Sequence, residues 1–120
     1  MIVSSSPEDR MALASALEGH PCPQHWATSL QESLDQVERT PPRVVICDAN
    51  LPDGSWRDLW DHLQFLPDPP VFLVMETNAD ERLWAEVLNV GGYDVLVKPF
   101  DVFEVFQVVR QACHTSSTPH

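Results

Sequence analysis

Apolar residues in this chain are concentrated in short runs, and stretches with helical spacing separate one run from the next. Four clear runs cover residues 1–3, 44–47, 71–75 and 93–97, and residues 25–28 form a weaker candidate crowded by prolines. A run that does not alternate with polar residues is typical of a strand buried on both faces of a parallel sheet. These segments are therefore predicted to be the strands of one sheet.

Helical spacing is clearest after the run at 44–47. Trp56, Leu59, Trp60 and Leu63 fall at i, i+3, i+4 and i+7, which places them on one stripe of a helix. At this spacing the two tryptophans are interpreted as core packing rather than as part of a cofactor site. Further helices are predicted over residues 7–18, 30–37 and 80–90, and again after residue 101.

Capping and turn residues mark the ends of several of these elements. Ser6 is the predicted N-cap of the first helix, with Pro7 at the first helical position and Gly19 as its stop. Residues 51–54 read Leu-Pro-Asp-Gly, which predicts a turn. Asp101 is placed to cap the last helix.

Strand and helix therefore alternate five times along the chain. This order indicates an α/β fold with a doubly wound five-stranded parallel sheet, (βα)5, and helices on both faces. The domain is predicted to cover residues 1–113, with 114–120 as a polar tail or the start of a linker. In such sheets the functional crevice lies at the carboxyl ends of the strands. The residues expected there are Ser4, Ser5, Asp48, Glu76, Thr77 and Lys98.

Two charged residues stand out at these strand ends. Lys98 is the only lysine of the chain, and it ends the run at 93–97 directly before a proline. Asp48 ends the run at 44–47 in the same way. Because the carboxyl ends of neighbouring parallel strands meet at one edge of a sheet, an anion and a cation are expected to share one pocket there.

Composition narrows the classes of function. The 120 residues have 18 acids against 7 lysines and arginines, a formal net charge of -11, which argues against binding of nucleic acid or anionic membranes by this domain. Three cysteines without CxxC spacing suggest reduced thiols and a cytoplasmic location. The five histidines show no zinc-ligand spacing, and no apolar stretch is long enough to span a bilayer.

Three segments together resemble the receiver domain of two-component response regulators. They are the run at 44–47, the stretch from Asp48 to Gly54, and Gly91 to Asp101, which reads GGYDVLVKPFD. The resemblance covers residues 1–113 and implies a flavodoxin-like, CheY-like fold with strand order 2-1-3-4-5. It also implies transfer of a phosphoryl group to an aspartate from a histidine kinase or a phosphotransfer protein.

The resemblance assigns a role to individual residues. Asp48 matches the phospho-acceptor, and Lys98 matches the lysine that contacts the phosphoryl oxygens, where a fixed ammonium would stabilise the transferred charge. Asn50 matches the position whose backbone carbonyl helps to hold Mg²⁺. No enzymatic activity is expected beyond self-phosphorylation of Asp48 from a phosphodonor.

The metal site departs from the family pattern. Family members usually have an acidic pair at the end of the first strand, where this chain has Ser4 and Ser5. Mg²⁺ is usually held by carboxylates, so Mg²⁺ binding is expected to be weak or absent. Glu8 and Asp9 lie nearby, inside the first helical turn, and are poorly placed to substitute as ligands.

The two positions that serve as a conformational switch in the family also differ from the family pattern. The usual switch serine or threonine aligns with Glu76, although a slip of one residue would place Thr77 there. A carboxylate at this position would repel a phosphoryl group and could instead pair with Lys98. The aromatic switch position aligns with Val95, and Tyr93 is two residues earlier, on the same face of an ideal strand.

Three functions remain open from the sequence. The chain could be an atypical receiver that accepts phosphate at Asp48, or a pseudo-receiver that works as an interaction or dimerisation module without phosphorylation. A flavodoxin-like cofactor binder, using the hydroxyls that precede the first helix, is a third alternative. The last helix has more apolar residues than one core stripe needs, which predicts a homodimer or partner interface that includes Phe103, Phe106 and Val109.

Overall fold

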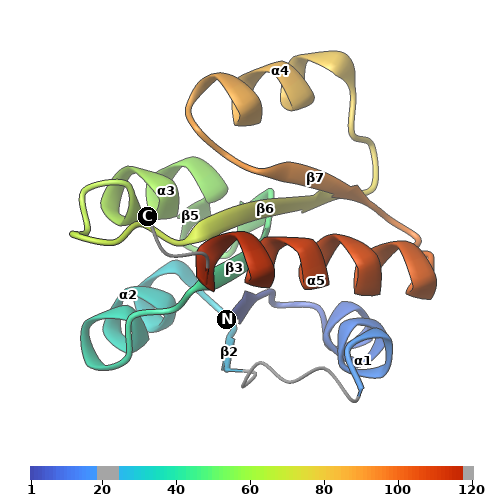
Figure 1. The fold of residues 1–120 in the computed structure, drawn as a ribbon, viewed down its shortest axis with the longest axis horizontal. Helices are drawn as coiled ribbons and strands as arrows, with labels where there is room; N and C mark the ends of the chain where they lie inside the picture. The colour runs from blue at the N-terminus through green and yellow to red at the C-terminus, as the bar shows by residue number, and fades with distance from the viewer. Residues whose placement is uncertain (19–24, 118–120) are drawn as a thin grey trace.

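The computed structural model describes residues 1–18 and 25–117 and forms a parallel sheet between two layers of helices (Figure 1). The sheet has the order β2-β1-β3-β6-β7, and all of its neighbouring strands are parallel. Counted along the chain, this is the order 2-1-3-4-5 expected for the doubly wound fold. The strands are β1 (Ile2–Val3), β2 (Trp26–Ala27), β3 (Val44–Asp48), β6 (Val71–Glu76) and β7 (Asp94–Val97).

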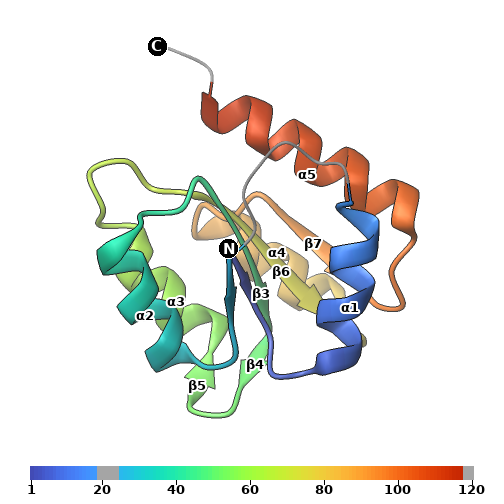
Figure 2. The same cartoon turned by 90° about the horizontal axis from the view of Figure 1, so that it is seen from below.

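The helices divide between the two faces of the sheet, as the end-on view shows (Figure 2). One core cluster contains Leu13 and Val105 and joins α1 and α5 to the sheet, whereas the other joins α2, α3 and α4 to the opposite face through Val37, Leu59 and Val87. The helices are α1 (Pro7–Ala16), α2 (Leu30–Arg39), α3 (Trp56–Leu63), α4 (Glu81–Asn89) and α5 (Val102–Ser117).

The helix ends follow their capping residues. Ser6 Oγ accepts a hydrogen bond from the Asp9 N–H at the start of α1, and Asp101 Oδ1 accepts one from Glu104 N–H at the start of α5. At its other end α1 has Leu17 as C-cap, and the predicted stop Gly19 lies outside the described residues. The helix α5 continues to Ser117, beyond the predicted domain end at 113, and residues 118–120 also lie outside the description.

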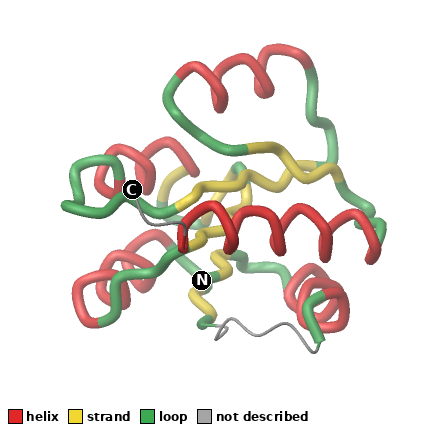
Figure 3. Tube along the Cα trace, viewed as in Figure 1, coloured by secondary structure: helices red, strands yellow, loops and turns green. Residues whose placement is uncertain are grey.

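The predicted turn at 51–54 lies within a small antiparallel hairpin of β4 (Asn50–Leu51) and β5 (Gly54–Ser55), which lies at the lower edge of the molecule in Figure 2. Figure 3 distinguishes the strands from the helices and loops by colour. Asp53 at its tip accepts hydrogen bonds from the backbone N–H groups of Leu30 and Gln31, at 2.7 and 3.0 Å. These bonds lower the pKa of Asp53, because they stabilise its charged form. The hairpin is therefore joined to the N-terminus of α2.

The tryptophan stripe of α3 packs in the core, as its spacing predicted. The four residues of the stripe are buried, and the centroid of the Trp60 ring lies 5.2 Å from that of the Phe72 ring in β6. The Trp60 indole N–H also donates to the Val90 carbonyl at 2.8 Å, which joins α3 to the end of α4. Within the described residues, no helix is both long and apolar enough to span a membrane.

Candidate functional site

The strand register brings the predicted site residues together at one edge of the sheet. Asp48 is the last residue of β3, and Ser4 follows β1, whose Val3 pairs with Cys47 of β3. Lys98 follows β7, and its backbone N–H donates to the Glu76 carbonyl at the end of β6. Both charged residues therefore leave the sheet at its carboxyl edge, as the sequence predicted.

Asp48 is almost fully buried, with 6% of its surface exposed, and both oxygens of its carboxylate accept hydrogen bonds. Ser4 Oγ donates to Oδ2 at 2.6 Å, and Lys98 Nζ donates to Oδ1 at 2.7 Å. A buried carboxylate requires such partners, since the unpaired charge would be costly in the interior. The predicted anion and cation are in contact at this edge of the sheet.

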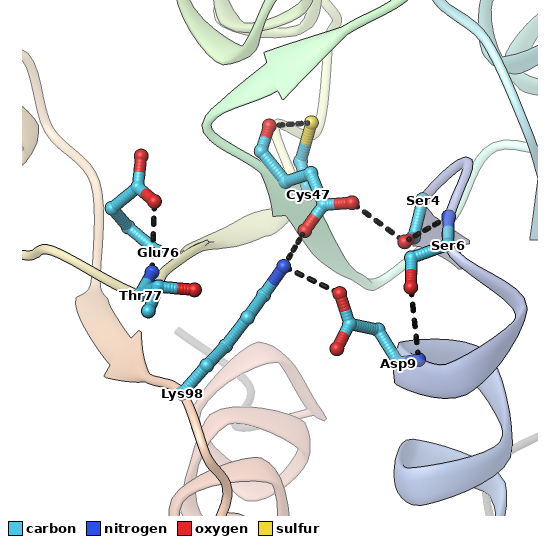
Figure 4. A network of polar contacts seen from close by, with 8 residues as sticks. Ser4, Ser6, Asp9, Cys47, Glu76, Thr77 and Lys98 are labelled. Carbon is cyan, nitrogen blue, oxygen red and sulfur yellow. Dashed lines mark hydrogen bonds and ion pairs between the residues drawn. The ribbon is translucent and has the colours of Figure 1, made fainter.

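Lys98 also bonds a second carboxylate, that of Asp9. Its ammonium donates to Asp9 Oδ2 at 2.5 Å, across 89 positions of the chain. Figure 4 shows Lys98 reaching from the β7 side toward Asp9 at the start of α1. Asp9 was expected to be poorly placed as a metal ligand because it lies inside the first helical turn; its side chain points from that turn into the site, where it bonds Lys98.

The two carboxylates also change the acid–base behaviour of Lys98. Burial by itself lowers the pKa of Lys98, but the hydrogen bonds to Asp48 and Asp9 and their negative charges outweigh burial, so the pKa lies above its ordinary value of 10.5. Lys98 therefore stays charged at neutral pH. Its contribution to stability is present below the pKa of the unfolded chain and is lost as the pH rises through the folded pKa.

Five residues close a ring of hydrogen bonds, which we call the polar ring: Ser4, Ser6, Asp9, Asp48 and Lys98. Ser4 donates to Asp48, which also accepts from Lys98, and Lys98 donates to Asp9. The ring closes through the Asp9 N–H, which donates to Ser6 Oγ, and the Ser6 N–H, which donates to Ser4 Oγ at 3.1 Å. Ser5, the other half of the predicted serine pair, is exposed.

The acid at the predicted switch position bonds the backbone beside it. Glu76 Oε1 accepts from the N–H of Thr77 at 2.8 Å, and its carboxylate points away from Lys98 in Figure 4. The pairing of Glu76 with Lys98 that the sequence allowed is therefore replaced by the pair with Asp9. Thr77 is exposed next to this edge of the sheet.

Val95 and Tyr93 lie on opposite faces of the sheet, which corrects the expectation that they share one. Val95 is buried in the cluster that joins α2, α3 and α4, whereas Tyr93 packs against the cluster on the α1 and α5 side. The strand alternation did not apply because β7 begins at Asp94, so Tyr93 precedes the strand.

The predicted interface residues of α5 differ in exposure. Phe103 is 73% exposed and Phe106 is half-buried, but Val109 is only 4% exposed and packs in the core, so it offers almost no surface to a partner. Phe103 and Phe106 line a shallow groove between α5 and the end of α1. The other residues of the groove are Ser15, Ala16, Glu18, Asp101 and Val102.

Cys47 and Asn50 lie on either side of the buried aspartate. Burial, and in second place the negative charge of Asp48, raises the pKa of the Cys47 thiol, so this thiol stays protonated and unreactive. Asn50, whose backbone carbonyl the resemblance assigned to Mg²⁺, starts the hairpin in β4 and pairs with Ser55.

The sheet order and the buried aspartate beside a lysine at its carboxyl edge define a doubly wound α/β domain of the receiver class. The family model for the response regulator receiver domain matches residues 1–110, and the chain belongs to this family. It is therefore a receiver domain of the two-component type, and the resemblance seen in the sequence is confirmed.

Curated relatives are 24–33% identical to this chain within the aligned regions. KdpE of Escherichia coli, a KDP operon transcriptional regulatory protein, is 30% identical, and the match covers 98% of this chain and 53% of KdpE. The response regulator PilR of Pseudomonas aeruginosa is 27% identical, with 93% of this chain and 25% of PilR covered. The chain thus spans about half of the first relative and a quarter of the second.

Solved structures have the same fold. A putative response regulator from Chloroflexus aurantiacus superposes with a TM-score of 0.86 at 24% identity, over 94% of both chains. The receiver domain of a putative LuxO repressor protein from Vibrio parahaemolyticus gives 0.90 at 19% identity, over 96% of this chain and 88% of that chain. At these identities the likeness shows the fold alone.

Proposed function

We propose that this chain is an atypical receiver domain that acts through protein contacts without phosphorylation of Asp48. The observation that supports this proposal most directly is the polar ring, in which both oxygens of the Asp48 carboxylate already accept short hydrogen bonds. To attack a phosphorus atom, Asp48 would have to give up at least part of this bonding. The ring therefore favours a resting site over a reactive one.

The charges of the polar ring also favour a site in which Asp48 is not phosphorylated. Asp9 and Asp48 bring two negative charges against the single positive charge of Lys98. Phosphoryl transfer requires neutralisation of the moving group, and the ammonium of Lys98 already pairs with the carboxylate of Asp9. An incoming phosphoryl group would meet net negative charge in this pocket.

The donor atoms around Asp48 also fit Mg²⁺ poorly, and we propose that Mg²⁺ binding is weak or absent. Ser4 provides a neutral hydroxyl that is already committed to Asp48, and Lys98 holds the other oxygen. Among the described residues, no group of three or more histidine, cysteine, aspartate or glutamate side chains could hold a metal ion. A hard dication prefers carboxylates that are free to bind it.

A second candidate function is slow phosphorylation of Asp48 by a histidine kinase or a phosphotransfer protein. The 2.7 Å contact between Lys98 Nζ and Asp48 supports this alternative, because it retains the acceptor and the lysine that the family uses. The cofactor-binding alternative has less support, since Ser4 bonds Asp48 and Ser6 caps α1.

The proposed partner surface is the groove between α1 and α5. Phe103 and Val102 are exposed there, beside the acidic side chains of Glu18 and Asp101. An apolar surface edged with negative charge suits a second protein with apolar and basic side chains, and a second copy of this chain is the other occupant we consider.

Intact mass after incubation with a small phosphodonor and Mg²⁺ tests the proposal. The comparison includes the wild type, Asp48→Ala, and a double variant, Ser4→Asp with Ser5→Asp, which restores the acidic pair. A conventional receiver reacts alongside as a positive control. We expect no phosphoryl gain in the wild type and a gain in the double variant. A gain in the wild type that Asp48→Ala abolishes would instead establish the second candidate.

A further inference from the structure

Asp9 makes two contacts, one through its backbone N–H and one through its carboxylate. Its backbone N–H donates to Ser6 Oγ, which is the ordinary capping bond of a helix start. Its carboxylate leaves the helix and accepts from Lys98 Nζ, with 21% of the Asp9 side chain and 18% of the Lys98 side chain exposed. This partly buried pair is a charge-assisted hydrogen bond, and such bonds are shorter and stronger than neutral ones.

The pair joins two parts of the chain that form one surface. Asp9 belongs to α1, and Lys98 begins the connection from β7 to α5, which reaches Asp101 three residues later. The same two elements line the groove further along, with Ala16 and Glu18 at the end of α1 and Val102 and Phe103 at the start of α5. The contact between Asp9 and Lys98 therefore joins the first turn of α1 to the connection that leads into α5.

We propose that Asp9 is a positioning residue, which holds Lys98 against Asp48 and fastens α1 to the connection between β7 and α5. Asp9 supplies the only contact of the polar ring between Lys98 and α1, so its loss opens the ring at that point. Lys98 then keeps Asp48 as its partner but gains freedom to move. This role of Asp9 does not depend on whether Asp48 accepts a phosphoryl group.

The single lysine of the chain makes this proposal directly measurable. Acylation by an N-hydroxysuccinimide ester at fixed pH modifies only Lys98 and the N-terminal amine, and peptide mapping separates the two. The comparison includes the wild type, Asp9→Asn, Asp9→Glu and Glu8→Gln. Glu8→Gln is the matched control, since it removes one negative charge from the exposed neighbouring position of the same helical turn.

We expect Lys98 of Asp9→Asn to react several times faster than in the wild type, because one of its two carboxylate partners is gone. Glu8→Gln should react like the wild type, and Asp9→Glu should restore most of the protection. Hydrogen exchange should increase in Asp9→Asn at residues 98–104 and in the first turn of α1, with the central strands unchanged.

Two results would overturn the proposal. Equal rates for Asp9→Asn and the wild type would mean that Asp9 does not restrain Lys98. Equal acceleration in Asp9→Asn and Glu8→Gln would mean that general charge, rather than the specific contact, governs the amine. If Asp9→Asn is globally destabilised, faster exchange throughout the sheet together with failure of Asp9→Glu to restore protection would likewise reject a positioning role.

Discussion

Ser4 gives the buried Asp48 a partner that a second carboxylate could not give. Two carboxylates in contact repel each other unless a cation or a proton lies between them, whereas a hydroxyl donates a hydrogen bond. The 2.6 Å bond from Ser4 Oγ therefore gives the buried carboxylate of Asp48 a hydrogen-bond donor from within the protein itself. At the scale of single residues, the hydroxyl of Ser4 gives Asp48 an internal hydrogen bond that a carboxylate at this position could not donate.

The hydroxyl of Ser4 should contribute measurably to the stability of the fold. Ser4→Ala should lower the free energy of unfolding by about 1–3 kcal/mol, because it leaves a buried acceptor with one partner fewer. Urea denaturation measures the change. Ser5→Ala is the control at an exposed position and should change stability by less than about 0.5 kcal/mol. Equal effects of the two substitutions would show that the bond from Ser4 adds nothing specific to stability.

The carboxylate of Asp53 joins the hairpin of β4 and β5 to α2. Asp53 accepts from two N–H groups in the first turn of α2, where backbone donors have no partner within the helix. Its negative charge also lies at the positive end of the helix dipole. At the scale of elements, the segment that follows Asp48 is positioned by a helix that lies elsewhere in the chain.

The lowered pKa of Asp53 makes this connection sensitive to acid. Its stabilising effect is present above the unfolded pKa, about 3.8, and is lost as the pH falls through the lower folded pKa. Asp53→Ala should therefore reduce the urea midpoint at neutral pH, and the difference from the wild type should shrink below about pH 3.8. Asp68→Ala, at another exposed loop position, is the control. A difference that persists unchanged into acid would contradict the role of the carboxylate charge.

The surface of the whole molecule has exposed phenylalanines at two separate places. Phe103 lies at the start of α5 beside the groove, and Phe65 lies in the loop after α3. Both are more than 70% exposed, so replacing either should leave the folded state intact. Only Phe103 adjoins the groove between α1 and α5. Phe103 is therefore the candidate for a partner surface, and Phe65 is an isolated apolar side chain.

If a second copy of this chain is the occupant of the groove, the wild type associates with itself at raised concentration and Phe103→Glu abolishes this association. Phe65→Glu should leave it unchanged, which makes that variant the matched control. Light scattering across a concentration series measures the mass, and urea denaturation verifies that each variant folds. A wild type that stays monomeric throughout, or a Phe103→Glu variant with unchanged mass, would contradict a self-association surface at the start of α5.

The amino-acid sequence by itself determined the fold class and the two central residues of the site. Non-alternating apolar runs predicted the buried strands, because a strand that is buried on both faces of a parallel sheet needs apolar side chains at consecutive positions. Asp48 and Lys98 followed from the same pattern, since each directly follows such a run and parallel strands end at one edge. The caps Ser6 and Asp101 were also local signals, and the structure confirms them.

Only the tertiary structure decided which side chains meet. The pair of Asp9 with Lys98 spans 89 positions and depends on how α1 lies against the connection after β7. Glu76 bonds its neighbouring N–H, and Val109 enters the core while Phe103 stays exposed. Periodicity defines the face on which a residue lies, but a hydrogen bond needs a distance of about 3 Å, and that distance depends on the packing of elements far apart in the chain.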